Sequence, residues 1–139
     1  MKTAIKFFAL TLVTAFGLSA TASADDAQTN APAATLPADS TKTGVTYASD
    51  IKPIFDAACV KCHNTAKRHS AGVGLDSLDA ILKGGKDGKI LTAGDSAHSD
   101  LVLSVAHVGD SDTFMPKHAK QLTPEQIGLI RAWIDQGAK

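Results

Sequence analysis

The chain contains only two cysteines, Cys59 and Cys62, and His63 follows them directly. Two cysteines in 139 residues exclude a disulfide-dense scaffold and a four-cysteine site for zinc or an iron–sulfur cluster. On a helical turn, thiols three positions apart project to the same side. The pattern therefore requires a fold that supports one local site, where two thiols and an imidazole lie together.

This Cys-Val-Lys-Cys-His segment is the pattern for covalent attachment of haem c. Each thiol can form a thioether with one of two adjacent vinyl groups, and the next imidazole can bind iron from the proximal side. We therefore predict one haem c with its iron, held by Cys59 and Cys62 and ligated by His63. Three alternatives compete. A thioredoxin-like cysteine pair would need a βαβ context, and none is visible. A zinc site could use His63 and His69 but has no second cysteine pair, and the third alternative is a structural disulfide.

The first residues have the composition of an export signal. Two lysines precede an apolar stretch of 12 residues at 7–18, and small residues follow up to Ala24. As a helix this stretch would rise only about 18 Å, well short of the ~30 Å hydrocarbon core of a bilayer. We therefore predict a signal peptide over residues 1–24, cleaved before Asp25, and a periplasmic protein with no membrane span after cleavage.

Residues 25–44 are rich in Ala, Thr, Asp and Pro and have no apolar period, so they are predicted to form a disordered linker. Residues 45–139 then form one small all-α domain, because helix-length amphipathic runs replace that composition and no stretch alternates long enough for a sheet.

Four helices are predicted within this domain. The first has Ser49 as its cap, and its buried stripe is Ile51, Ile54, Phe55 and Ala58. The second spans about 77–83 and ends at Gly84-Gly85. The third runs over about 96–106 with Asp95 or Ser96 as its cap, and Leu101, Val102 and Val105 face inward. The fourth helix begins with a capping box of Thr123 and Gln126, with Pro124 at its first position. Gly137 ends it. Its apolar face consists of Ile127, Ile130, Trp133 and Ile134.

Met115 is the candidate for the sixth iron ligand, because Met1 leaves with the signal peptide and the chain has no other methionine. It lies in a Pro-containing loop after a polar stretch at 109–112. A thioether opposite histidine raises the reduction potential, which suits electron transfer. The alternatives are that Met115 fills a gap in the core or that a histidine takes its place. The competing histidines are His69, His98, His107 and His118.

The net charge of the chain excludes one class of binding partner. The 14 basic and 14 acidic residues give no basic excess, which argues against a nucleic-acid binder. A basic cluster around the cysteine motif could steer an acidic redox partner protein, with a solvated face as the alternative. Its members are Lys52, Lys61, Lys67 and Arg68. We expect a monomer.

The ordered motifs of the last 95 residues resemble a class I cytochrome c, and more narrowly the planctomycete-type cytochrome c domain. The motifs are Asp50-Ile51-Lys52-Pro53-Ile54-Phe55, Cys59 to His63, Gly74-Leu75-Asp76-Ser77, Lys83-Gly84-Gly85, Gly94-Asp95-Ser96, Ser99-Asp100-Leu101, Met115-Pro116, and Leu122-Thr123 through Trp133-Ile134 to Gly137-Ala138. One departure is Lys117, where many relatives have a second Pro.

The resemblance implies a small fold of about four helices around one covalently attached haem. It implies that Cys59 and Cys62 hold the haem, that His63 is the proximal ligand and that Met115 is the distal one. The expected function is that of a periplasmic monohaem electron carrier, which is not an enzyme. The alternative is a haem subunit or sensor domain with a displaceable sixth ligand that binds a small molecule.

Overall fold

The structure, a computed structural model, describes residues 35–66 and 70–139. The predicted signal peptide, residues 25–34 of the predicted linker, and Lys67, Arg68 and His69 lie outside the described residues. No helix in the described part of the chain combines the length and the hydrophobicity needed to cross a membrane.

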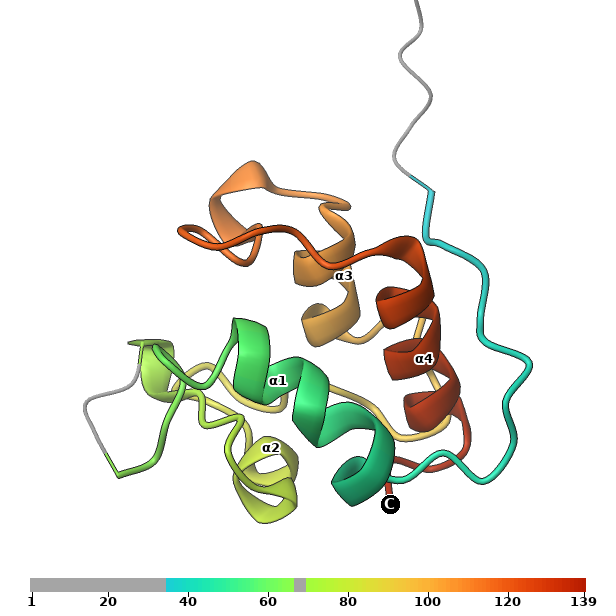
Figure 1. The fold of residues 1–139 in the computed structure, drawn as a ribbon. Coiled ribbons are helices and arrows are strands. Elements are labelled where there is room, and N and C mark those ends of the chain that lie inside the picture. The colour runs from blue at the N-terminus through green and yellow to red at the C-terminus, as the bar shows by residue number, and fades with distance from the viewer. Residues whose placement is uncertain (1–34, 67–69) are drawn as a thin grey trace, which may run out of the picture. The chain divides into compact units, whose positions relative to one another are not determined.

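Four α-helices and three short helical turns make up the described chain (Figure 1). In chain order they are η1 (Tyr47–Ile51), α1 (Lys52–Ala58), η2 (Ser70–Gly72), α2 (Leu78–Lys83), α3 (Asp100–Ala106), η3 (Ser111–Thr113) and α4 (Pro124–Asp135). Within residues 35–66 and 70–139, β-structure is limited to two isolated bridges, Gly85 with Gly88 and Thr92 with Asp95. The prediction of a small all-α fold with four helices is confirmed.

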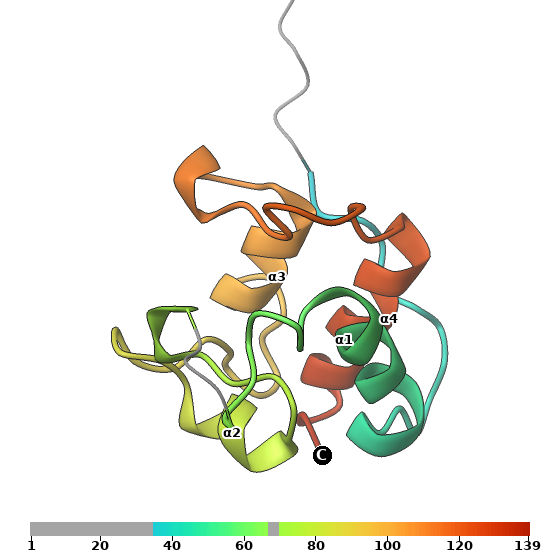
Figure 2. The ribbon, with the colours of Figure 1, turned by 60° about the vertical axis from the view of Figure 1, so that its left-hand side comes forward.

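The core lies where α4 contacts both α3 and η1 (Figures 1 and 2). Trp133 on α4 is fully buried, and its Nε1–H donates to the carbonyl of Lys139 at 2.9 Å. That same carbonyl accepts from the N–H of Tyr47 at 2.9 Å, so the end of the chain joins α4 to η1. The other fully buried apolar side chains are Ile51, Phe55, Ile81, Val102, Ile130 and Ile134.

The helix ends test the predicted caps. The Ser77 side chain caps α2 by accepting from the N–H of Ala80, and α4 has the predicted capping box of Thr123 and Gln126. The prediction that Ser49 caps the first helix was wrong. The cap is Thr46, whose side chain accepts from the Ser49 N–H, because the chain enters α1 through the wider turn η1.

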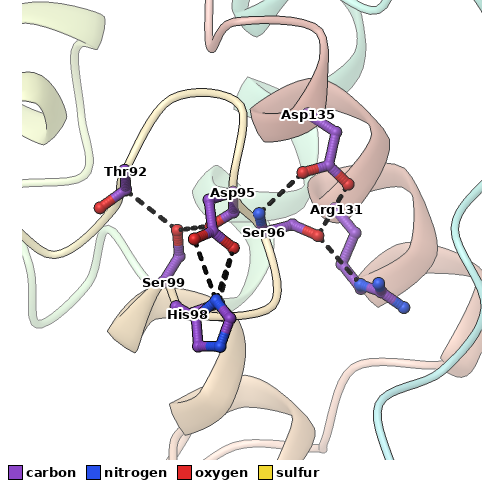
Figure 3. A network of polar contacts seen from close by, with 7 residues as sticks. All are labelled: Thr92, Asp95, Ser96, His98, Ser99, Arg131 and Asp135. Atoms are coloured by element: carbon purple, nitrogen blue, oxygen red, sulfur yellow. Dashed lines mark hydrogen bonds and ion pairs between the residues drawn. The ribbon is translucent and has the colours of Figure 1, made fainter.

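The third helix begins at Asp100, four residues later than predicted, because a tertiary network uses the polar groups before it (Figure 3). The N–H and the hydroxyl of buried Ser96 donate to the Asp135 carboxylate on α4, at 2.7 and 2.8 Å. Arg131 Nε donates to the Ser96 hydroxyl at 3.2 Å. Asp95 accepts from the His98 ring at 2.9 Å, and its carbonyl accepts from the Ser99 hydroxyl. These bonds fix the loop before α3 on α4.

Residues 35–44, which the sequence analysis assigned to the linker, run along α4 (Figure 1). The N–H of Ser40 donates to the carbonyl of Gly128 at 3.0 Å, and the Gln136 amide donates to the carbonyl of Lys42 at 2.8 Å. Arg131 pairs with Asp39 at 2.8 Å. Gly128 lets this segment approach closely, since an added Cβ would lie 2.5 Å from the carbonyl oxygen of Ala38.

Gly128→Ala tests this close approach. On an open helix face, alanine would stabilise the protein by about 1 kcal/mol relative to glycine. Here the Cβ would overlap backbone, so we expect a lower free energy of unfolding and faster hydrogen exchange at the Ser40 amide. Chemical denaturation and hydrogen exchange by NMR would measure both. Stabilisation with unchanged exchange would show that residues 35–44 do not lie on this face.

Candidate haem-binding site

The cysteine and histidine side chains lie on a turn that directly follows α1. Cys59 is the C-cap residue, and its N–H and that of Val60 donate to the carbonyl of Phe55 at 2.8 and 2.9 Å. The carbonyl of Cys59 accepts from the N–H groups of Cys62 and His63, at 3.1 and 2.9 Å. Since Phe55 is fully buried, the turn is anchored to the core. It holds both thiols and the imidazole within five residues.

The His63 ring is held by the segment that leads into α2. Its Nδ1 lies 3.2 Å from the carbonyl of Val73, and its own carbonyl accepts from the N–H of Leu75 at 2.9 Å. A carbonyl can only accept, so Nδ1 must carry a proton, and in the neutral ring this leaves the lone pair on Nε2. A metal-ligating histidine has this arrangement, with the far nitrogen bonded to a backbone oxygen.

A buried tyrosine supports the same segment. The Tyr47 hydroxyl donates to the carbonyl of Leu75 at 3.2 Å, and the Tyr47 ring packs on Trp133 with centroids 6.2 Å apart. Burial raises the pKa of Tyr47, which keeps the phenol protonated and able to donate. The contact joins the His63 support to the core of the domain.

The Gly74-Leu75-Asp76-Ser77 motif has a structural role at each position. An added Cβ on Gly74 would lie 2.5 Å from the Thr65 side chain, so a larger residue would require that side chain to move. Leu75 is buried, the Asp76 carboxylate accepts from the N–H and hydroxyl of Thr65 at 3.2 and 2.6 Å, and Ser77 caps α2. The motif therefore fixes the return of the chain beside His63.

The two thiols are free; Cys59 is half-buried and Cys62 exposed. Burial raises the pKa of Cys59 to about 11, so this thiol is protonated at neutral pH. Thiol exchange and zinc binding use the thiolate, and reactive thiols with lowered pKa lie at helix N-termini, whereas Cys59 lies at the C-terminal end of α1. Across residues 35–66 and 70–139, no three His, Cys, Asp or Glu side chains group as metal ligands. The raised pKa and the position of Cys59 disfavour the thioredoxin-like alternative, whereas the zinc alternative also uses His69, which lies outside the described residues.

Met115 lies on the loop after α3 and is partly buried against the core. Its N–H donates to the carbonyl of Ser104 on α3 at 3.0 Å, and its carbonyl is 3.0 Å from Nε2 of His107. In both views this loop lies beyond the C-terminal end of α1, the end that carries the cysteine turn (Figures 1 and 2). Both backbone polar groups of Met115 are thus bonded to the same helix and its cap.

The His107 ring has partners at both nitrogens. Nε2 contacts the Met115 carbonyl, and Nδ1 lies 2.7 Å from the Gln121 amide nitrogen. The ring also stacks on Phe114, with centroids 4.6 Å apart and planes 9° from parallel. In this arrangement His107 has no nitrogen left for iron.

The other histidines that compete for the sixth position have different surroundings. The His98 side chain is 82% exposed, and its Nδ1 pairs with the Asp95 carboxylate at 2.9 Å. His118 is exposed, and His69 lies outside the described residues. Neither His98 nor His118 is packed against the core as Met115 is.

Sequence reasoning did not single out Val73, Tyr47 or Gln121. Val73 contributes only a carbonyl oxygen, which every residue has, and Gln121 meets His107 across 14 residues of chain. Tyr47 offered the one usable signal, since aromatic residues are only 5% of the sequence. A scarce aromatic beside a motif is a candidate support.

These residues fit a covalently held haem. The turn supplies two free thiols and an imidazole with an unprotonated Nε2. Several apolar side chains of the turn and its neighbours pack on the core but stay partly buried, which leaves apolar surface for a flat ring to cover: Ala58 at the end of α1, Val60 in the turn and Val73 beside His63.

The family model described as planctomycete cytochrome C matches residues 59–118. The match begins at Cys59 and extends past Met115, so it includes every residue predicted to hold or ligate the haem. No curated protein and no solved structure matches the chain. The motifs, the fold and this match agree: residues 59–118 match the model of the planctomycete cytochrome C family, and a cytochrome c domain implies covalently bound haem c.

Proposed function

We propose that this protein is an exported, periplasmic monohaem cytochrome c that carries single electrons between redox partner proteins. Cys59 and Cys62 hold the haem, His63 is its proximal ligand and Met115 its distal ligand. The bound haem supplies an iron that alternates between ferrous and ferric states. The observation that carries the proposal is the cysteine turn with its His63 Nδ1 proton committed to the Val73 carbonyl.

On the proximal side, the chain supplies orientation. The bond to Val73 fixes the plane of the His63 ring, and the bond from Leu75 fixes its backbone. Hydrogen bonding at Nδ1 also makes Nε2 a stronger donor to the metal. Because these partners are backbone groups on a core-anchored segment, they need no rearrangement when the iron changes charge.

On the distal side, burial and bonding favour Met115 over the histidines. Met115 is packed against the core, while His107 is bonded at both nitrogens and His98 is exposed. A soft thioether stabilises ferrous iron, so this ligand supports a carrier that must accept an electron readily.

A redox partner with an acidic docking surface is part of the proposal. Of the predicted basic cluster, Lys61 is exposed, whereas Lys52 pairs with Asp56 one turn along the helix at 2.7 Å. Lys67 and Arg68 lie outside the described residues.

Met115→Ala tests the distal ligand. In ferric protein matured in the periplasm, we expect the far-red iron–sulfur charge-transfer band to disappear and the reduction potential to fall, since the thioether no longer stabilises ferrous iron. Ferrous Met115→Ala should bind carbon monoxide rapidly, whereas native protein should resist it. His98→Ala is the matched control and should behave as native protein. An unchanged spectrum would transfer the ligand role to a histidine, and rapid binding to native protein would favour the displaceable-ligand alternative.

Cys59→Ser and Cys62→Ser test the attachment. Each single variant should retain covalent haem through one thioether, and its pyridine haemochrome band should shift to the red because one vinyl group stays unsaturated. The double variant should release its haem to acidic acetone. Haem that resists extraction from the double variant would show that these thiols are not the attachment points.

A further inference from the structure

The C-terminal end of α3 and the Met115 loop meet at one imidazole, that of His107. His107 is the C-cap residue of α3, in the left-handed conformation (φ 58°, ψ 45°), and its N–H donates to the carbonyls of Leu103 and Ser104. Its ring is partly buried and faces the loop that carries Met115. The ring therefore connects a helix end in the core to the loop of the distal ligand.

Only one protonation state of the ring satisfies both of its hydrogen bonds as drawn. The Met115 carbonyl can only accept, so Nε2 of His107 carries a proton and donates over 3.0 Å. Nδ1 is then an acceptor, and the Gln121 amide N–H donates to it over 2.7 Å. Gln121 directly precedes buried Leu122, so its side chain extends from a fixed part of the chain.

The ring holds the loop at two adjacent residues. The ring stacks on Phe114. It cannot rotate without breaking a hydrogen bond, because both of its nitrogens are bonded in the ring plane. Three contacts therefore hold the loop on α3: the stacking of Phe114 on His107, the bond from His107 to the Met115 carbonyl, and the bond from the Met115 N–H to the Ser104 carbonyl at 3.0 Å. The first two depend on the His107 side chain.

We propose that His107 is a positioning residue that holds Met115 in place as the distal ligand, with Gln121 setting its tautomer. This inference rests on the proposed function, because it presumes that Met115 binds the iron. Loss of the ring frees the Met115 carbonyl and Phe114, and the thioether leaves the iron more often.

His107→Asn tests the proposal in the exported holoprotein. Asparagine tolerates the left-handed conformation but lacks the ring, so the helix end is kept. Removal of one neutral hydrogen bond raises the population of open loops about fivefold. We expect carbon monoxide to bind the ferrous variant about fivefold faster, with a weaker far-red band and a lower reduction potential. Gln121→Leu should shift all three in the same direction, and nitrogen-15 NMR should find the proton of His107 on Nε2.

His98→Asn is the matched control, since that ring is exposed and bonded to Asp95 before the first residue of α3, whereas the Met115 loop follows the last residue of this helix. It should show the native band, rate and potential. A native protein without the far-red band would overturn Met115 ligation and this inference with it. A native protein with the band, but with His107→Asn and Gln121→Leu unchanged in band, rate and potential, would overturn this inference alone.

Discussion

The His63 imidazole can face only one way, because its Nδ1 proton is committed to the carbonyl of Val73, 3.2 Å away. The rest of the proximal side follows from this bond. Leu75 holds the His63 backbone, and Tyr47 holds Leu75. Gly74 permits the approach of the two segments, since a side chain there would overlap Thr65. The proposed proximal ligand is thus oriented almost entirely by backbone groups, whose positions the core fixes.

The proposed distal ligand, Met115, is supported differently, by one backbone carbonyl and one side chain at the end of a short helix. Ser104 and His107 hold the backbone of Met115, and α3 in turn packs on α4. The network of Ser96, Asp135 and Arg131 fixes the loop before α3 on the same helix (Figure 3). Since α4 also contacts η1, it packs both on the helix that supports Met115 and on the turn that leads into α1.

Short sequence motifs correctly predicted those structural features that depend only on residues close in sequence. The Thr123 cap was predicted correctly, because a side chain that bonds three residues ahead needs no tertiary partner. Position 96 was misassigned as a helix start, because Ser96 bonds to Asp135, 39 residues away. Composition likewise described residues 25–44 as a linker, but composition carries no information about backbone bonds such as that from Ser40 to Gly128. Cysteine spacing gave the site, whereas its supports are long-range contacts.

The few aromatic residues of the domain lie either in the core or beside the segments that support the proposed ligands. Residues 45–139 contain four, and two of them, Phe55 and Trp133, are fully buried beneath the cysteine turn and in α4. The other two contact the supports of the proposed ligands: Tyr47 bonds to the segment beside His63, and Phe114 stacks on His107 beside Met115. Two aromatic rings therefore belong to the apolar core, while the other two each brace a segment that carries a proposed iron ligand. This division is compatible with the proposed haem-binding domain, because both proposed ligands would be held by segments that a large ring supports.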